Sequence, residues 1–92
     1  MMKINRTSRF KKEYRQMIRR GCDSQLFEYV VGEIANGRSL AQKYNDHELK
    51  GNFADFRECH IEPDWLLIYL VENDILILTL TRTGTHADLF KK

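Results

Sequence analysis

The fold is decided by residues 55–83, which read DFRECHIEPD WLLIYLVEND ILILTLTRT. Three strand-like runs, 55–61, 65–72 and 75–83, are separated by Glu62-Pro63-Asp64 and by Asn73-Asp74. Pro suits the second position of a turn, and Asn-Asp tolerates left-handed backbone, so both separators predict hairpin turns. The run from 65 to 71 is apolar on both faces, which is typical of a central strand covered on both sides.

The N-terminal part of the chain has a helical period instead. Residues 2–5 are short and predict an edge strand. A basic amphipathic helix follows over roughly 8–20, and Asp23 is placed to cap a second helix that Asn36-Gly37 stops. Because few residues join the two helices, we expect an antiparallel helical hairpin. Their apolar stripes are Phe10, Tyr14, Met17 and Ile18, then Leu26, Phe27, Val30, Val31 and Ile34.

These elements predict an α+β domain in which the helical hairpin packs on a mostly antiparallel sheet of about four strands. With 92 residues and 11.0 kDa, the chain suits one domain, residues 1–92. Residues 38–54 are polar and mixed, and predict a long loop with a short turn. Loops of that length in a small domain are commonly functional.

Composition narrows the class of protein. The longest nearly apolar stretch is too short for a membrane span, and no basic start leads into an apolar secretory segment, so we expect a cytoplasmic protein. The two cysteines have no framework spacing and predict reduced thiols. Net charge is +2, but residues 1–20 hold eight Lys or Arg against one acid, for +7. That segment suits a polyanion, an acidic partner protein or a solvated helix face.

The residue pairing expected across the two hairpins places polar residues together at one end of the sheet. If Asn73-Asp74 is a two-residue turn, Trp65 pairs with Arg82; if Pro63-Asp64 is another, His60 pairs with Leu67. His60, Trp65 and Arg82 then share one face, and the tail after residue 83 brings His86 close to His60 and Asp64. A three-residue turn at 62–64 would move His60 to the opposite face.

The three histidines, His47, His60 and His86, are candidates for acid–base chemistry with Asp64, although each is also compatible with an ordinary surface histidine. No HxH, HExxH or Cys-His spacing supports a metal site, and no cofactor is predicted. Other residues have two interpretations. Trp65 and Phe90 suit either the core or stacking on an unpaired base, while cations suited to phosphate are Arg82, Lys50 and Arg57.

Three blocks of the sequence resemble the YafQ family of bacterial toxins, within the RelE/ParE superfamily of type II toxin–antitoxin systems. They are DHELKGN at 46–52, RECHIEPDWLLIY at 57–69 and RTGTHADLF at 82–90, and together they cover about half of the chain. The resemblance implies the small RelE-like α+β fold. It also implies an endoribonuclease that cleaves mRNA, typically on the translating ribosome, and is held inactive by a cognate antitoxin, in a complex expected to bind operator DNA.

By motif position, the resemblance places the catalytic residues at His47, His60, Asp64 and His86, and further active-site aromatics at Trp65 and Phe90. The implied chemistry is metal-independent attack of a ribose 2′-hydroxyl on the adjacent phosphate. In this scheme His60 or Asp64 is the base and His86 the acid. His47 and Arg82 contact the phosphate in the same scheme.

The alternative is a protein of the same fold that acts by binding instead of cleavage. A DNA gyrase poison, a DNA-binding corepressor with its antitoxin or an RNA-binding module would each use this fold without the nuclease chemistry. Replacing the histidines would leave such an activity intact.

Overall fold

The computed structural model describes residues 2–72 and 77–90, which form an α+β domain around one five-stranded sheet. The strand order is β1-β5-β4-β3-β2, parallel between β1 and β5 and antiparallel elsewhere. The elements are β1 (Lys3–Arg6), α1 (Ser8–Arg19), α2 (Ser24–Ala35), η1 (Gln42–Tyr44), β2 (His47–Glu48), η2 (Gly51–Phe53), β3 (Arg57–Glu62), β4 (Trp65–Glu72), β5 (Ile77–Gly84) and α3 (His86–Phe90).

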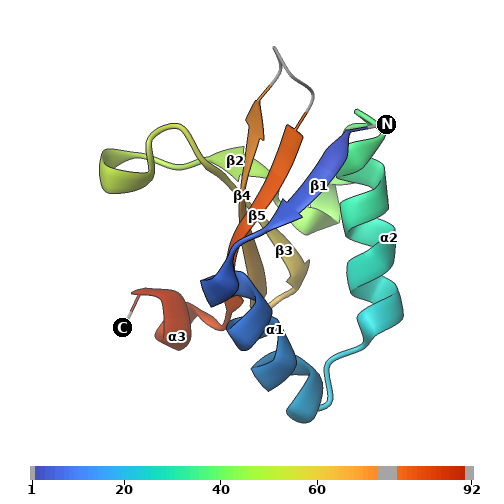
Figure 1. Ribbon diagram of the computed structural model, residues 1–92, viewed down its shortest axis with the longest axis vertical. Coiled ribbons are helices and arrows are strands. Elements are labelled where there is room, and N and C mark those ends of the chain that lie inside the picture. Colours follow the sequence, from blue (N-terminus) through green and yellow to red (C-terminus); the bar gives the residue numbers. More distant parts are fainter. Residues whose placement is uncertain (1, 73–76, 91–92) are drawn as a thin grey trace.

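Helices α1 and α2 lie on one face of the sheet and run in roughly opposite directions (Figure 1). Thr7 caps α1 by accepting a hydrogen bond from the Phe10 amide, and Asp23 caps α2 through the Gln25 amide. Gly21 follows α1 with a φ of 96°, a conformation that glycine adopts without the strain of a Cβ. The predicted helical hairpin is confirmed, because cap residues and apolar stripes are local signals.

The main core lies between these helices and the sheet. It contains Phe10, Phe27, Trp65, Leu67, Tyr69, Leu78 and Leu80 among other buried side chains. The opposite face of the sheet is covered by a smaller cluster to which the C-terminal helix α3 and the segment around η2 contribute; its buried members are Leu66, Ile68 and Leu89. Both faces of β4 are therefore covered, as its uniformly apolar sequence predicts.

The sheet has one strand more than expected. The predicted loop over 38–54 contains β2, which pairs His47 with Glu58 and Glu48 with Arg57. The edge strand predicted over residues 2–5 is present as β1, Lys3–Arg6, which completes the other side of the sheet beside β5. The predicted Asn73-Asp74 turn lies outside the described residues.

The predicted register is wrong in both hairpins. Glu62 does pair with Trp65, but Ile61 is an extra residue in β3, so His60 pairs with Leu66 instead of Leu67. In the next hairpin Glu72 pairs with Ile77, which leaves four residues between the partners where the prediction has two. A second irregularity between Ile68 and Tyr69 then sets Ile68 opposite Arg82. Each extra residue moves the following side chains to another partner or face.

The register decides which side chains reach the site. Trp65 packs in the main core with 1% of its surface exposed, stacked on Phe27, and its indole N–H donates to Thr83 Oγ1 at 2.9 Å. His60 lies on the other face of the sheet, beside Leu66. The expectation that His60, Trp65 and Arg82 share one face is thus wrong.

Two further predictions concern the cysteines and membrane-spanning segments. Cys22 and Cys59 are free thiols, as predicted, and burial raises the pKa of Cys59, so this thiol stays protonated and unreactive. Among the described residues, no helix is both long enough and apolar enough to cross a bilayer.

Candidate active site

Three imidazole rings meet on the face of the sheet opposite α1 and α2. His47 comes from β2, His60 from β3 and His86 from the first position of α3. The ring centroids of His60 and His86 are 5.5 Å apart, and those of His47 and His60 are 6.3 Å apart. The cluster is partly open to solvent, since the exposed fractions of the three side chains are 40% for His47, 20% for His60 and 52% for His86.

A buried carboxylate lies beneath two of these rings. Glu58 Oε1 is 3.5 Å from His47 Nε2 and 3.6 Å from His60 Nε2, while only 6% of the Glu58 side chain is exposed. Its other oxygen, Oε2, is buried and has no hydrogen-bond partner among the described residues. A buried carboxylate is expensive unless cations or donors face it, and the two imidazoles are the groups that face Glu58.

Glu58 was not among the predicted site residues. The signal was present in the alternation of the strand, because Glu58 and His60 are two residues apart in β3 and must lie on the same face. The pairing of His47 with Glu58 across β2 and β3 then brings the third member to the same place.

Asp64 holds His86 by two contacts. The backbone N–H of His86 donates to Asp64 Oδ1 at 2.9 Å, and His86 Nδ1 lies 2.7 Å from the same oxygen. The hydrogen bonds from His86 lower the pKa of Asp64, so this carboxylate remains ionised at neutral pH. With Nδ1 directed to Asp64, the opposite ring nitrogen, Nε2, is available to a substrate. The predicted approach of His86 to His60 and Asp64 is confirmed.

The position of His47 is fixed through its neighbours in the loop. Asn45 has a φ of 46°, which turns the chain into β2, and its carbonyl lies 2.6 Å from His47 Nδ1. Asp46 accepts hydrogen bonds from the Tyr69 hydroxyl at 2.5 Å and from Arg57 Nε at 3.2 Å. Burial and the Asp46 carboxylate raise the pKa of Tyr69, so its phenol stays a donor in this network.

Helix α3 is attached to the N-terminal helix through Asp88. Asp88 Oδ2 accepts from the Thr85 amide at 3.0 Å, and the Asp88 amide donates to Thr85 Oγ1 at 3.1 Å, which together form a capping box. Arg20 Nη1, just after α1, donates to the same carboxylate oxygen at 2.7 Å. These contacts fix the helix that carries His86.

A pH titration tests this attachment. The Arg20 side chain and the Thr85 donors lower the pKa of Asp88 from 3.8 to about 2. Because the pKa is lowered by folding, the contacts stabilise α3 above about pH 4 and weaken as the pH falls towards 2. We expect Arg20→Gln to raise the titration midpoint of the Asp88 carboxyl carbon, measured by NMR, whereas the exposed neighbour Arg19→Gln leaves it unchanged. Equal midpoints in both variants would contradict the contact.

Of the three cations expected to bind phosphate, Arg57 and Arg82 are paired with carboxylates and Lys50 is exposed. Arg57 is held by Asp46 and lies 3.6 Å from Glu48. Arg82 forms a bidentate pair with Glu13 of α1, at 2.6 Å and 3.2 Å, and only 14% of its side chain is exposed. Lys50 is exposed, at the end of the loop that carries His47. Two of the three predicted phosphate contacts are therefore occupied by carboxylates of the chain itself.

The two aromatic candidates, Trp65 and Phe90, lie on opposite faces of the sheet. Trp65 belongs to the core on the far face, so its interpretation as a base-stacking residue is wrong in this structure. Phe90 is half-buried at the end of α3 and packs against the smaller cluster, on the same side of the sheet as the histidines. Phe90 is thus partly accessible to solvent.

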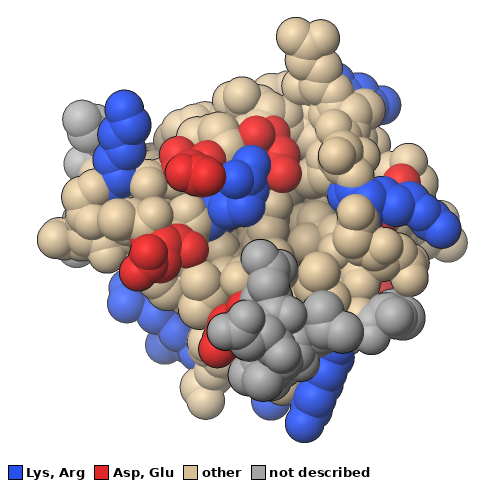
Figure 2. Space-filling model, turned by 90° about the horizontal axis from the view of Figure 1, so that it is seen from above, with Lys and Arg blue, Asp and Glu red and all other residues tan. Residues whose placement is uncertain are grey.

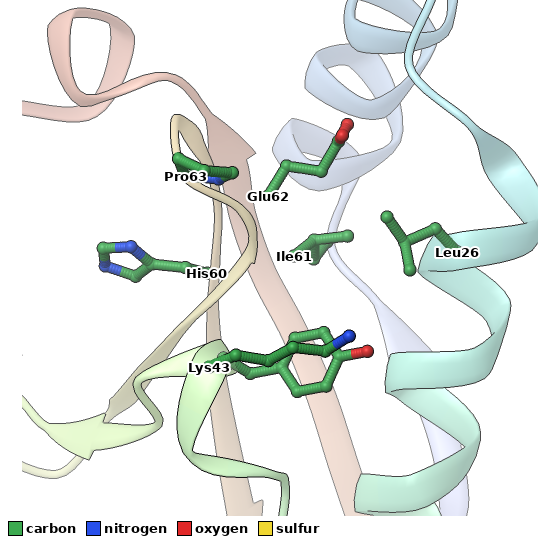
Figure 3. Close-up of a pocket in the computed structure, with 7 residues that line it drawn as sticks. Leu26, Lys43, His60, Ile61, Glu62 and Pro63 are labelled. Atoms are coloured by element: carbon green, nitrogen blue, oxygen red, sulfur yellow. The ribbon is translucent and has the colours of Figure 1, made fainter.

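A pocket of about 270 Å³ lies behind the histidine cluster, between α2, η1 and β3. Figure 3 shows the His60 ring pointing away from Leu26 and Ile61, to the other side of β3. The pocket therefore adjoins His60 without receiving its ring. No group of three His, Cys, Asp or Glu side chains in residues 2–72 and 77–90 is arranged to hold a metal ion.

Comparison with known proteins agrees with this geometry. A family model described as a bacterial toxin of type II toxin–antitoxin systems, YafQ, matches residues 2–91. The chain belongs to the YafQ family. It is similar to the mRNA interferase toxin YafQ of Escherichia coli K12, with 34% identity over 88 residues, which covers 95% of this chain and 94% of that protein.

Solved structures of YafQ proteins and related toxins share the fold. A metal-bound toxin from Helicobacter pylori superposes with a TM-score of 0.92 at 42% identity, covering 98% of this chain and 100% of that one. YafQ in the E. coli DinJ–YafQ complex superposes with a TM-score of 0.87 at 34% identity, covering 98% and 99% of the two chains. The expected fold class is confirmed, and the chain is a YafQ-family toxin by sequence and by structure.

Proposed function

We propose that this YafQ-family chain is an endoribonuclease that cleaves mRNA on the translating ribosome and thereby inhibits growth. The observation that carries the proposal is the cluster of three imidazoles, in which His47 and His60 lie beside the buried Glu58 and His86 is held by Asp64. Two imidazoles beside one phosphate can act as the general base and the general acid in the cleavage of RNA. The relationship to the E. coli mRNA interferase, at 34% identity, supports the same substrate class.

His60 takes the role of base in this proposal. It removes the proton from the ribose 2′-hydroxyl, and the O2′ electron pair forms a bond to the adjacent phosphorus. Glu58 Oε1 lies 3.6 Å from His60 Nε2 and holds the ring in position for this step. Glu58 is too buried to meet the substrate, so it acts through His60 as a positioning residue.

His86 takes the role of acid. Its bond to Asp64 orients the ring and leaves Nε2 to donate a proton to the departing 5′ oxygen as the P–O5′ bond breaks. The products are a 2′,3′-cyclic phosphate and a 5′-hydroxyl. The 5.5 Å between the ring centroids of His60 and His86 supports their acting on one phosphodiester.

The remaining residues bind the substrate. His47 and the exposed Lys50 face the charge that develops on the phosphate, and Phe90 contacts a base. Arg57 and Arg82 retain their internal carboxylate partners and position the site instead of the phosphate. No metal enters this sequence of steps.

A cognate antitoxin is the expected protein partner, since E. coli YafQ has been solved in complex with its antitoxin DinJ. Such a complex would hold the toxin inactive and bind operator DNA. The ribosome and its mRNA are the other expected partners, because the ribosome presents single-stranded mRNA to the site.

The proposal is tested by inducing the chain alone in a bacterium and mapping new 5′ ends on cellular mRNA. We expect growth arrest, with new 5′-hydroxyl ends that are biased to one codon position, and loss of both effects in His60→Gln. A matched control is Gln25→Ala on the exposed side of α2, which should behave as the parent. Arrest without new RNA ends, equal in parent and His60→Gln, would direct the search to gyrase or another bound target.

A further inference from the structure

Helix α1 carries a uniformly basic surface that the catalytic steps do not use. Its outer face, defined as Lys11, Lys12, Arg15 and Arg19, is exposed to solvent. None of these four side chains lies within ion-pairing distance of an acidic group in the described part of the chain. Figure 2 shows another face of the molecule, on which acidic side chains lie next to basic ones.

The spacing of the outer face carries an electrostatic cost. Lys11, Arg15 and Arg19 follow one another at four-residue intervals, and Lys12 is three residues before Arg15, so like charges are helix neighbours. The one acid of α1, Glu13, points inward to Arg82 and also lies 3.8 Å from Arg9. Repulsion on the outer face is thus uncompensated within the helix, as expected for a surface that meets a polyanion.

The histidine site itself has little free positive charge. Arg57 is neutralised by Asp46 and Arg82 by Glu13, while Glu58 adds a buried negative charge. Affinity for nucleic acid depends mainly on cations that release counterions from phosphates. Most of the electrostatic attraction for RNA must therefore come from outside the site.

The C-terminal end of α1 lies near the helix that carries His86. Arg20 follows Arg19 directly and binds Asp88 at 2.7 Å, and Asp88 lies two residues after His86 in α3. The C-terminal end of α1 is consequently in contact with the helix that carries the proposed acid. The outer face itself lies on the other side of the sheet from the histidine cluster, so an RNA strand that occupies the cluster reaches it by passing round this end of α1.

From this placement we infer that the outer face of α1 binds the sugar–phosphate backbone of the substrate RNA, on nucleotides that lie away from the cleaved bond along the strand. The inference rests on the proposed function and extends it to the way in which the substrate is held. Binding there is independent of base sequence, because Lys and Arg contact phosphates. It raises affinity for long RNA and leaves the chemical step unchanged.

The test compares two triple variants with the same change of charge. Lys12→Gln/Arg15→Gln/Arg19→Gln removes most of the outer face, and Lys3→Gln/Arg38→Gln/Lys43→Gln removes three exposed basic residues elsewhere. Affinity for a long single-stranded RNA is measured against salt concentration by fluorescence anisotropy, with both triples also carrying His86→Ala to prevent cleavage. Cleavage of a dinucleotide is measured with His86 intact.

We expect the outer-face triple to bind long RNA more weakly by on the order of 10²-fold at about 50 mM salt. The salt slope should flatten by about 0.7 for each phosphate that the variant no longer neutralises. Dinucleotide cleavage should be unchanged, and the temperature of unfolding should be equal or higher because like charges have been removed. The control triple should bind as the parent does.

Equal affinities and salt slopes in the two triples would overturn the inference. Loss of inhibition by the antitoxin with unchanged RNA binding would also overturn it, and would assign the outer face to an acidic protein partner. If the parent binds RNA through this face but never cleaves it, the proposed nuclease function fails while the RNA-binding surface stands. The two failures are therefore distinguishable.

Discussion

Replacing His86 with alanine is expected to lower the rate of RNA cleavage by roughly 10²–10⁴-fold, the usual loss when a general acid is removed. The backbone N–H of His86 keeps its bond to Asp64 in the variant, and the Thr85–Asp88 capping box does not involve the ring. The helix should therefore stay in place, and the loss should appear in the chemical step instead of in substrate binding.

Single-turnover cleavage with purified toxin and translating ribosomes measures this loss. Ala87→Ser is the matched control, because Ala87 is the exposed neighbour of His86 in α3 and has no role in the site. Cleavage by His86→Ala at the parental rate would remove His86 from the mechanism. A loss that excess ribosomes restore would show that His86 binds the substrate and transfers no proton.

Replacing Trp65 with alanine is expected to lower the free energy of unfolding by about 3–5 kcal/mol. Trp65 is 1% exposed, stacks on Phe27 with centroids 6.2 Å apart, and donates to Thr83 Oγ1. Alanine would leave a cavity between α2 and the sheet and remove the indole donor from a buried hydroxyl. In a domain of this size, such a loss is a large part of the total stability.

Urea unfolding followed by circular dichroism checks the effect. Trp65→Phe keeps much of the ring volume and should lose less stability than Trp65→Ala, while the folded fraction of both should retain the activity of the parent. Phe90→Ala should show the opposite pattern, with a small loss of stability and a larger loss of cleavage. A stable Trp65→Ala variant with impaired cleavage would restore Trp65 to the substrate site.

The helices and the fold class followed from local signals in the sequence. Thr7 and Asp23 are side-chain caps whose hydrogen bonds are made within two or three residues, so their effect does not depend on distant contacts. The continuous apolar run of β4 correctly placed that strand at the centre of the sheet. The short β2 has no such signal, because two residues carry no measurable alternation.

The site was predicted less well than the fold, because strand register is sensitive to single residues. One extra residue, Ile61, turned His60 away from the face that holds Trp65. The approach of His86 to Asp64 survived this error, since it depends only on which end of the sheet the last strand leaves. Glu58 became recognisable only when His47 and His60 were found on either side of it.

The ion pair between Arg82 and Glu13 could not be predicted from the sequence pattern. The two residues are 69 positions apart, and nothing in either local pattern indicates that one neutralises the other. A lone arginine near a histidine motif therefore favoured a phosphate contact that the folded chain does not offer. Long-range ion pairs of this kind are set by packing, which the sequence pattern does not contain.

We propose that two imidazoles, those of His60 and His86, cleave RNA by acid–base chemistry through the ribose 2′-hydroxyl. The most direct measurement is the chemical identity of the RNA ends that the purified toxin produces on translating ribosomes, compared with His86→Ala. We expect a 2′,3′-cyclic phosphate and a 5′-hydroxyl from the parent and almost no product from the variant. Ends with a 3′-hydroxyl and a 5′-phosphate, or equal cleavage by His86→Ala, would contradict it.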